Sequence, residues 1–171
     1  MLSKKLEEAL NAQINAELWS AYLYLSMSAD FAAKGLNGFA NWMEIQFKEE
    51  QDHAMKFFNY ILSRGGKVDL RPIAKVQKTW KTPLSAFQST LEHEQVVTKL
   101  INDLYALATD EKDYATQSML KWFIDEQVEE EESAQAIIDT LKLLDGNGYG
   151  LYQLDKELAA RVYTPLAQSA E

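Results

Sequence analysis

A chain of 171 residues with 47% apolar side chains is long enough to bury a substantial core as one domain, expected to span residues 1–171. It contains no cysteine, which excludes disulfides, iron–sulfur clusters and cysteine nucleophiles, so any metal must be bound through nitrogen and oxygen. The net charge of -9 argues against nucleic acid as a partner, because phosphate recognition requires clustered Lys and Arg.

The amino-terminal residues 1–10 mix charged and apolar side chains in a helical pattern. They lack the continuous apolar stretch of a secretory signal. No segment of the sequence is long and apolar enough to cross a bilayer. We therefore expect a soluble, cytoplasmic protein with no membrane partner.

Helical periodicity runs between three regions that hold all seven glycines and two of the three prolines. It predicts helices over residues 3–33, 38–64, 83–109, 114–144 and 151–162. The third start is the clearest, because Thr82 followed by Pro83 is an N-cap residue followed by proline at the first helical position. Asp113 is the corresponding N-cap candidate for the fourth helix.

The connections between these helices predict their topology. The first two long helices, and likewise the third and fourth, are joined by about five residues or fewer, which favours antiparallel neighbours. The middle link of roughly 18 residues can extend about 55 Å, more than the about 42 Å length of a 28-residue helix. The prediction is an all-α fold: an antiparallel four-helix bundle over about residues 3–144, with one long crossover and a short fifth helix.

Each long helix carries an apolar stripe at spacings of three and four residues, and polar side chains break each stripe near the helix midpoint. The interrupting residues are Glu17 in the first helix, Glu50 and His53 in the second, Glu94 in the third, and Gln127 and Glu130 in the fourth. Helix midpoints coincide whether the helices run parallel or antiparallel. These six side chains are therefore expected to meet in one layer at the centre of the bundle.

Four carboxylates in an apolar layer repel one another and lose their hydration, so protonation or bound metal must compensate them. The four stripes contain no Lys or Arg to do so. Oxygen ligands with one imidazole suit two iron or manganese ions better than zinc or copper. Glu50 and His53 lie one helical turn apart and can reach the same ion, and Gln127 and Glu130 repeat that spacing.

Simpler explanations exist for individual residues. Glu17 alone would more often mark a misassigned or partly exposed helix face, but four such interruptions at matching depth make that explanation poor for the whole set. Tyr24 and Trp122 are equally compatible with core or contact aromatics. The acidic run at residues 129–132 is typical of a solvated face, and His93 lies off its stripe and is expected to be exposed.

The segments Glu50-Gln51-Asp52-His53 and Glu126-Gln127-Val128-Glu129-Glu130, with the lone Glu17 and Glu94, closely resemble non-haem bacterial ferritins. The resemblance covers nearly the whole chain, including the short fifth helix. It implies the ferritin-like fold and a hollow homo-oligomeric shell of 24 subunits. It also implies that the shell takes up Fe(II), oxidises it with dioxygen or hydrogen peroxide, and stores ferric oxyhydroxide.

The resemblance also implies roles for individual residues. Glu17, Glu50 and His53 would bind one iron, and Glu50, Glu94 and Glu130 the other, so that Glu50 bridges the pair. The remaining implied site residues are Gln127 beside these ligands, Tyr24 and Trp122 as nearby electron-donating aromatics, and Glu49, Glu126 and Glu129, which would share Glu130 in a third iron site.

Differences from the motifs of related diiron proteins narrow the class of protein that is expected. A fully symmetric diiron bundle has Glu-x-x-His on two helices, whereas here the fourth helix presents Gln127 and Glu130, which predicts a loosely held second iron. Gln51 stands where bacterioferritins have their haem-ligating methionine, so no haem is expected. The absence of cysteine likewise disfavours a rubrerythrin.

Two other classes of function stay open on the residues alone. A diiron oxygenase or a dimanganese catalase would keep its metal tightly and form no mineral, and a purely structural helical module would bind no stoichiometric metal. The fifth helix has an apolar stripe of Leu151, Leu154, Leu158 and Val162 that is too short to be stable alone. It must dock either on its own bundle or at an assembly contact.

Overall fold

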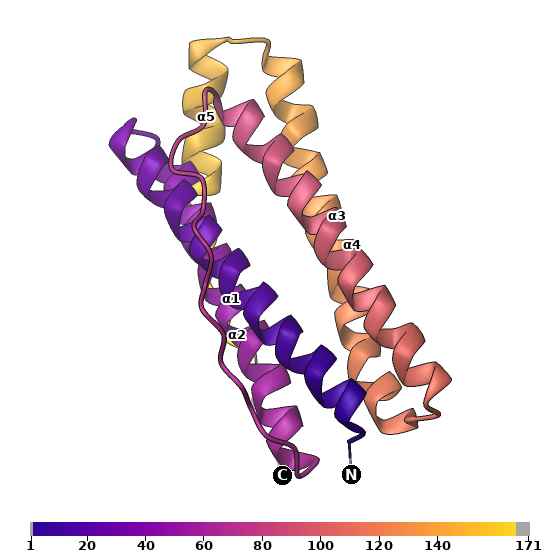
Figure 1. Cartoon of the computed structure of the whole chain (residues 1–171). Helices are drawn as coiled ribbons and strands as arrows, with labels where there is room; N and C mark the ends of the chain where they lie inside the picture. Colours follow the sequence, from indigo (N-terminus) through magenta and orange to yellow (C-terminus); the bar gives the residue numbers. More distant parts are fainter. Residues whose placement is uncertain (1, 167–171) are drawn as a thin grey trace. The chain divides into compact units, whose positions relative to one another are not determined.

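Helices form nearly all of the regular structure. The computed structural model describes residues 2–166, and within this range it contains helices and no strand. The helices are α1 (Lys4–Ala33), α2 (Asn37–Ser63), α3 (Pro83–Asp110), α4 (Tyr114–Leu144) and α5 (Gly148–Leu158), as shown in Figure 1. None of the helices in the described range is long and apolar enough to cross a membrane.

Side-chain caps start α3 and α4 where the sequence predicts. The Thr82 hydroxyl accepts a hydrogen bond from the Ser85 amide, and the Ser85 hydroxyl accepts one from the Thr82 amide, both at 3.0 Å. This reciprocal pair satisfies two amides that the first turn of a helix leaves without partners. Asp113 caps α4 by accepting from the Thr116 amide at 3.0 Å. Both predicted N-caps are confirmed.

The short fifth helix is confirmed, but it begins three residues before the predicted position 151 and ends four residues before position 162. The helix begins at Gly148, because the Asn147 side chain accepts from the Gly150 amide at 2.9 Å and caps it. It ends at Leu158, where the Asn41 side-chain amide of α2 donates to the Leu158 carbonyl at 3.2 Å. Val162 therefore lies outside the helix and is 81% exposed, so the apolar stripe stops at Leu158.

The chain divides into two compact units. Of the described residues, the first unit comprises residues 2, 11–80 and 147–166, and the second comprises residues 3–10 and 81–146. α1 thus contributes its first turns to the second unit and the rest of its length to the first.

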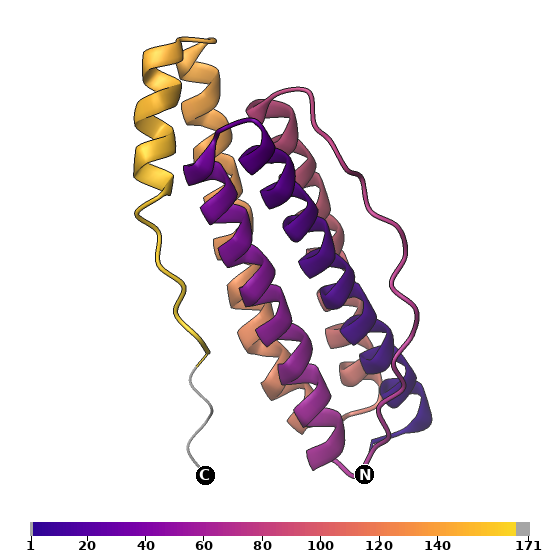
Figure 2. The same cartoon turned by 90° about the vertical axis from the view of Figure 1, so that its left-hand side faces the viewer.

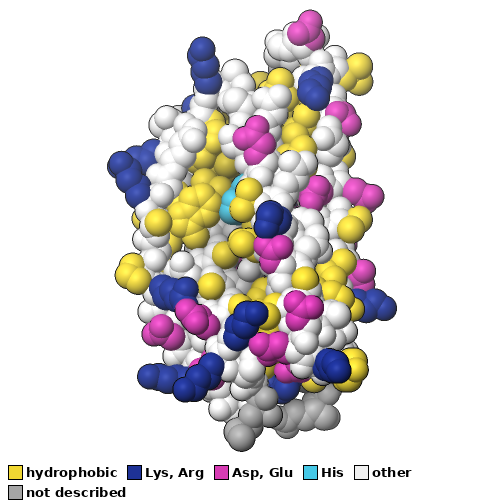
Figure 3. Space-filling model, turned by 45° about the vertical axis from the view of Figure 1, so that its right-hand side comes forward, with side chains coloured by type: hydrophobic (Ala, Val, Ile, Leu, Met, Phe, Trp, Pro, Cys, Tyr) yellow, Lys and Arg dark blue, Asp and Glu magenta, His cyan; other side chains and the backbone are white. Residues whose placement is uncertain are grey.

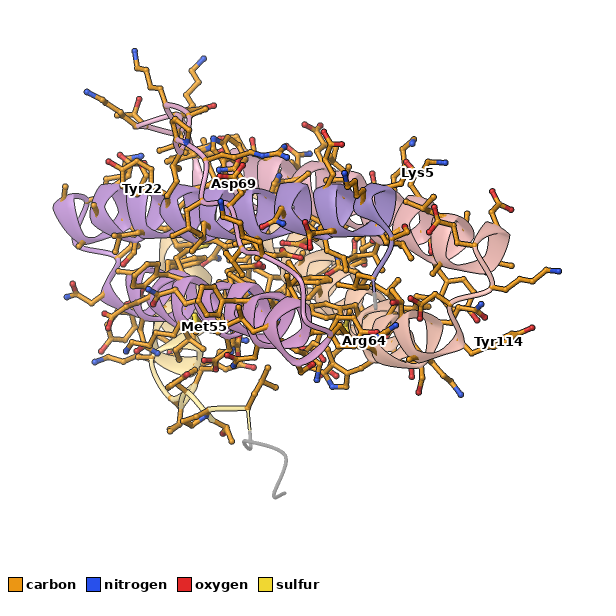
Figure 4. All side chains as sticks on the ribbon, turned by 60° about the horizontal axis from the view of Figure 1, so that its bottom comes forward. Lys5, Tyr22, Met55, Arg64, Asp69 and Tyr114 are labelled. Carbon is orange, nitrogen blue, oxygen red and sulfur yellow. The ribbon has the colours of Figure 1, made fainter. Side chains whose placement is uncertain are left out.

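In the first unit, α1 and α2 lie side by side and antiparallel (Figures 1 and 2). The turn between them passes through Gly35, whose φ of +76° lies in the left-handed region, and the Leu36 amide bonds back to the Phe31 carbonyl at 3.0 Å. Large apolar side chains of this unit remain exposed, among them Tyr22 of α1 and Met55 of α2, both labelled in Figure 4.

The crossover from α2 to α3 runs in an extended conformation along α1. Side chains on α1 fasten it by hydrogen bonds to its backbone. The first bond joins the Asn11 amide to the Lys67 carbonyl at 2.9 Å, and the last joins the Trp80 amide to the Asp30 carboxylate at 3.0 Å. The α1 residues involved are Asn11, Asn15, Ser26 and Asp30. Several backbone groups of the crossover thus find hydrogen-bond partners on α1 without forming a strand.

The fifth helix packs on α2 of its own chain. The Asp155 carboxylate accepts from the Gly38 amide at 2.8 Å and from the Phe39 amide at 3.1 Å. It therefore satisfies two amides at the positive end of α2 that have no partner within the helix. Leu154 and Leu158 are buried, which answers where the predicted apolar stripe docks.

In the second unit, α3 and α4 are antiparallel and joined by residues 111–113. Phe87 and Ile101 of α3 and Leu120 and Phe123 of α4 are among its fully buried apolar residues.

Acidic and basic side chains are both scattered over the face of the molecule drawn in Figure 3. On that face, the net acidity of the chain is thus not gathered into a single patch.

Candidate metal centre

α1 and α2 bring three of the predicted metal ligands together. Glu17, Glu50 and His53 each offer a ligand atom, and these atoms all lie within 4.8 Å of one another. All three residues are at most 2% exposed. Glu50 and His53 stand one turn apart on α2, with His53 Nδ1 3.4 Å from Glu50 Oε2. The cluster therefore offers two carboxylates and one imidazole to a single small ion.

The electrostatics of Glu17 fit a bound cation. Gln13, one turn earlier on α1, donates to Glu17 Oε1 at 2.9 Å. Ionised carboxylates only accept hydrogen bonds, so when Glu17 and Glu50 are both charged, Glu17 Oε2 has no donor among residues 2–166. Burial raises the pKa of Glu17, and the nearby His53, the Gln13 bond and the Glu50 contact oppose that rise only in part. A divalent cation would supply the missing partner.

Replacing Glu17 with glutamine will change how the stability of the metal-free protein depends on pH. In the unfolded chain Glu17 ionises near its ordinary pKa of 4.5, whereas burial raises that pKa in the fold. Unfolding therefore releases a proton, and the free energy of unfolding of the wild type falls as the pH rises through this window. Glu17→Gln has no such proton. The free energy of unfolding of this variant, relative to that of the wild type, will therefore increase from about pH 4.5 upward.

Denaturant unfolding of chelator-treated protein at several pH values measures this difference. Glu8→Gln, an exposed change on the same helix, serves as the matched control and should run parallel to the wild type. Added Fe(II) under anaerobic conditions should stabilise the wild type and not Glu17→Gln. Stability curves of Glu17→Gln and wild type that stay parallel across the pH range would contradict the electrostatic assignment.

The second unit buries the other predicted ligands. Glu94, Gln127 and Glu130 are all buried. The Gln127 side-chain amide donates to Glu94 Oε2 at 3.1 Å and also approaches the Glu94 carbonyl at 3.3 Å and Thr98 Oγ1 at 3.4 Å. The Thr98 hydroxyl in turn donates to Glu131 at 2.5 Å. Gln127 thus fixes the orientation of the Glu94 carboxylate.

The residues predicted for the third iron site differ in how deeply they are buried. Glu126 is half-buried and Glu129 is exposed on α4. Glu49, on α2, is half-buried, and its carboxylate is 2.8 Å from the guanidinium of Arg161. The local sequence gave no sign of this ion pair, because its partners are far apart along the chain.

Tyr24, Trp122 and His93 are the remaining residues that the sequence analysis considered. Tyr24 is fully buried on α1, two turns beyond Glu17, and half-buried Trp122 packs edge-on against Phe123 with ring centroids 4.8 Å apart. The expectation for His93 is wrong, because it is half-buried instead of exposed. Burial lowers the pKa of His93 more than the neighbouring Glu94 raises it, which favours the neutral imidazole.

Gln13 is a supporting residue of the cluster that the sequence pattern did not single out. Gln13 positions the Glu17 carboxylate, and its spacing of four from Glu17 would place the two side chains on the same helix face. A buried glutamine one turn from a buried glutamate is therefore a usable signal for such a partner.

Comparison with known proteins places the chain in a family. A model of the Ferritin-like domain matches residues 7–144. The bacterial non-haem ferritin of Bacteroides fragilis (strain 638R) is 45% identical over 161 residues, covering 94% of this chain and all of that protein. That of Staphylococcus aureus (strain USA300) is 40% identical over 163 residues, covering 95% of this chain and 98% of that protein.

Solved structures give the same result. The open-pore ferritin from the hyperthermophilic archaeon Archaeoglobus fulgidus is 49% identical, with a TM-score of 0.94 over 95% of this chain and all of that one. Its engineered closed form has a TM-score of 0.95 over 96% of this chain. These similarities confirm the predicted fold class, the ferritin-like four-helix bundle with a short fifth helix. With the family model and the relatives in agreement over nearly its full length, the chain belongs to the ferritins, the iron-storage proteins.

Proposed function

We propose that this ferritin is a ferroxidase, which oxidises Fe(II) at a centre built on Glu17, Glu50 and His53 and deposits the product as ferric oxyhydroxide. The observation that carries the proposal is the cluster itself. Three ligand atoms lie within 4.8 Å of one another in a buried setting, and no Lys or Arg of the described residues pairs with Glu17.

The donor set suits Fe(II) as the substrate. Two carboxylates carry a charge that a divalent ion neutralises, and a neutral imidazole adds a nitrogen ligand. The Gln13 bond holds the Glu17 carboxylate in one orientation before the ion arrives. The site therefore needs little rearrangement to bind, and its ligands lose their mutual repulsion when it fills.

The proposed chemistry balances in electrons and protons. Two Fe(II) ions give one electron each to dioxygen, which takes up two protons and leaves as hydrogen peroxide. Each Fe(III) then reacts with two waters, forming FeOOH and releasing three protons. Four protons are released in all for each pair of iron ions, and they pass to solvent. Hydrogen peroxide as the oxidant takes the same two electrons and is reduced to water.

A second iron is assigned to Glu50, Glu94 and Glu130, with Glu50 as the shared ligand. Its support is the sequence pattern and the family resemblance, together with the burial of Glu94 and Glu130 and the hydrogen bond by which Gln127 orients Glu94. A third iron on Glu49, Glu126, Glu129 and Glu130 completes the assignment. Tyr24 is kept as a candidate electron donor, because it lies buried on the helix that carries Glu17.

The subunits are proposed to assemble into a homo-oligomeric shell of 24 chains that encloses the mineral. The relatives that support this are ferritins matched over nearly their whole length. Exposed apolar side chains such as Tyr22, Met55 and Leu62 are about half accessible. Burying them between subunits would contribute about 25 cal/mol per Å² of apolar area. The proposal keeps the cytoplasmic location expected from the sequence.

Anaerobic loading followed by exposure to air tests the proposal. Purified metal-free protein is mixed with Fe(II), air is admitted, and ferric absorbance is followed while light scattering gives the particle size. Rapid oxidation with iron retained far beyond about two per chain in a shell-sized particle supports storage with ferroxidase activity. A particle that holds only about two irons per chain and forms no mineral would instead indicate a diiron enzyme.

A further inference from the structure

The chain that follows α5 returns along α2. We name residues 159–166 the C-terminal segment; Figure 2 shows it leaving the end of α5. Its contacts with α2 involve Asn41, Glu49 and Asp52. These residues are spaced eight and three apart and so lie on one face of the helix. Several separate attachments along one face make the segment a defined part of the first unit.

Arg161 makes the densest of these contacts. Its Nη2 donates to Glu49 Oε2 at 2.8 Å, and its Nη1 donates to Gln46 Oε1 at 2.7 Å. The guanidinium carbon lies 4.7 Å from the centre of the Trp42 ring, a stacking arrangement that favours arginine over lysine. Asn41 fixes the backbone beside it by donating to the Arg161 carbonyl at 3.0 Å.

Tyr163 provides a second attachment two residues further on. Its hydroxyl donates to Asp52 Oδ2 at 2.6 Å, and the Leu166 amide reaches the same carboxylate oxygen at 3.3 Å. The bond to Asp52 raises the pKa of Tyr163 to about 12, so the phenol keeps its proton at any physiological pH. The attachment therefore does not depend on pH in that range.

Arg161 binds a carboxylate that is also proposed to bind the third iron. Glu49, on α2, is one of the residues proposed to bind the third iron. Its neighbour in the chain is Glu50, the ligand proposed to bridge the first two irons. The lone pairs of Glu49 Oε2 that face a guanidinium N–H cannot also face an iron ion, and two cations at one carboxylate repel each other. The ion pair between Arg161 and Glu49 therefore persists for as long as the C-terminal segment is docked.

We propose that Arg161 competes with iron for the Glu49 carboxylate, so that docking of the C-terminal segment weakens iron binding at the third site. The inference rests on the proposed function, because it takes the third site as given. Coupling between two binding events is reciprocal. Releasing Arg161 must strengthen iron binding at the third site, and iron at that site must loosen the C-terminal segment. A partly exposed ion pair supports a change of about three- to tenfold in affinity.

Anaerobic titration with Fe(II), followed by calorimetry, measures the first half of this coupling. Arg161→Gln should tighten the weakest class of sites about three- to tenfold, and Arg161→Lys should lie between it and the wild type. The matched control is Arg64→Gln, which removes the same charge at the end of α2. Arg64, labelled in Figure 4, lies over the Tyr60 ring. Adding Glu49→Gln to Arg161→Gln should abolish the gain. Equal weak-site affinity in Arg161→Gln and Arg64→Gln would overturn the proposal.

Hydrogen exchange read by mass spectrometry measures the other half without any turnover. Peptides that begin after Leu158 should exchange faster when wild-type protein is saturated with Fe(II) under anaerobic conditions. They should be insensitive to iron in Glu49→Gln. Exchange that is unchanged by iron in the wild type would also overturn the proposal.

The same titration separates failure of this inference from failure of the proposed function. If the wild type binds no tight Fe(II) at all, the ferroxidase assignment itself fails. If about two tight irons per chain bind, and only the response to Arg161→Gln is missing, the competition alone is wrong.

Discussion

Glu50→Ala will slow the initial oxidation of Fe(II) at least about 100-fold while leaving the shell assembled. Glu50 is buried, its carboxylate stands 3.4 Å from His53, and its ligand atom lies within 4.8 Å of those of Glu17 and His53. The family resemblance also implies that Glu50 is a ligand of both irons, as proposed above. Its removal therefore takes a ligand from each metal ion, and it also removes a buried charge, so the apoprotein should lose little stability.

Stopped-flow absorbance after mixing anaerobic Fe(II)–protein with aerated buffer measures the rate, and light scattering checks the assembly. Gln51→Ala is the matched control, since Gln51 is the next residue of the same helix and is exposed. It should oxidise iron at the wild-type rate. If Glu50→Ala matched that rate in an intact particle, the assignment of the centre would be refuted.

Gly38→Ala will detach α5 from α2. A Cβ at position 38 would lie 1.6 Å from the Asp155 carbonyl oxygen and 2.5 Å from its carbon, so it meets backbone that no side-chain rotation can move. The helix must shift, which breaks the bonds from the Gly38 and Phe39 amides to Asp155. Together with partial exposure of Leu154 and Leu158, we expect a loss of about 3 kcal/mol in the free energy of unfolding.

Denaturant unfolding gives the loss, and hydrogen exchange in residues 148–158 shows whether the fifth helix is the part that loosens. Gly148→Ala is the control, because a Cβ there meets nothing within 4 Å. A Gly38→Ala variant as stable as this control, with α5 still protected, would mean that α5 does not pack as closely on α2 as the structure has it.

Local signals were enough to predict most of the helices. The bounds of α4 match the predicted residues 114–144, and the Thr82–Pro83 start of α3 is confirmed, because capping chemistry acts within one turn and is written in adjacent residues. The fifth helix was misplaced for the opposite reason. Its glycine-rich first turn looks like a break, and its last carbonyl is capped by Asn41, a residue more than one hundred positions away.

The candidate site likewise has a part that local sequence predicts and a part that depends on contacts between distant residues. The clustering of Glu17, Glu50 and His53 followed from helical spacing and the depth at which the stripes are broken. The residues that hydrogen-bond or pair with these acidic side chains could not be predicted in this way. The hold of Arg161 on Glu49 depends on how the C-terminal segment folds back, and the half-burial of His93 depends on packing that the periodicity of one helix does not contain.

Diffraction from crystals soaked anaerobically with Fe(II) tests the central claim most directly. An anomalous difference map recorded at the iron absorption edge should show an ion bonded to Glu17, Glu50 and His53, at about 2.0–2.2 Å from their ligand atoms. A map with ordered side chains and no anomalous peak at these three residues would contradict the account.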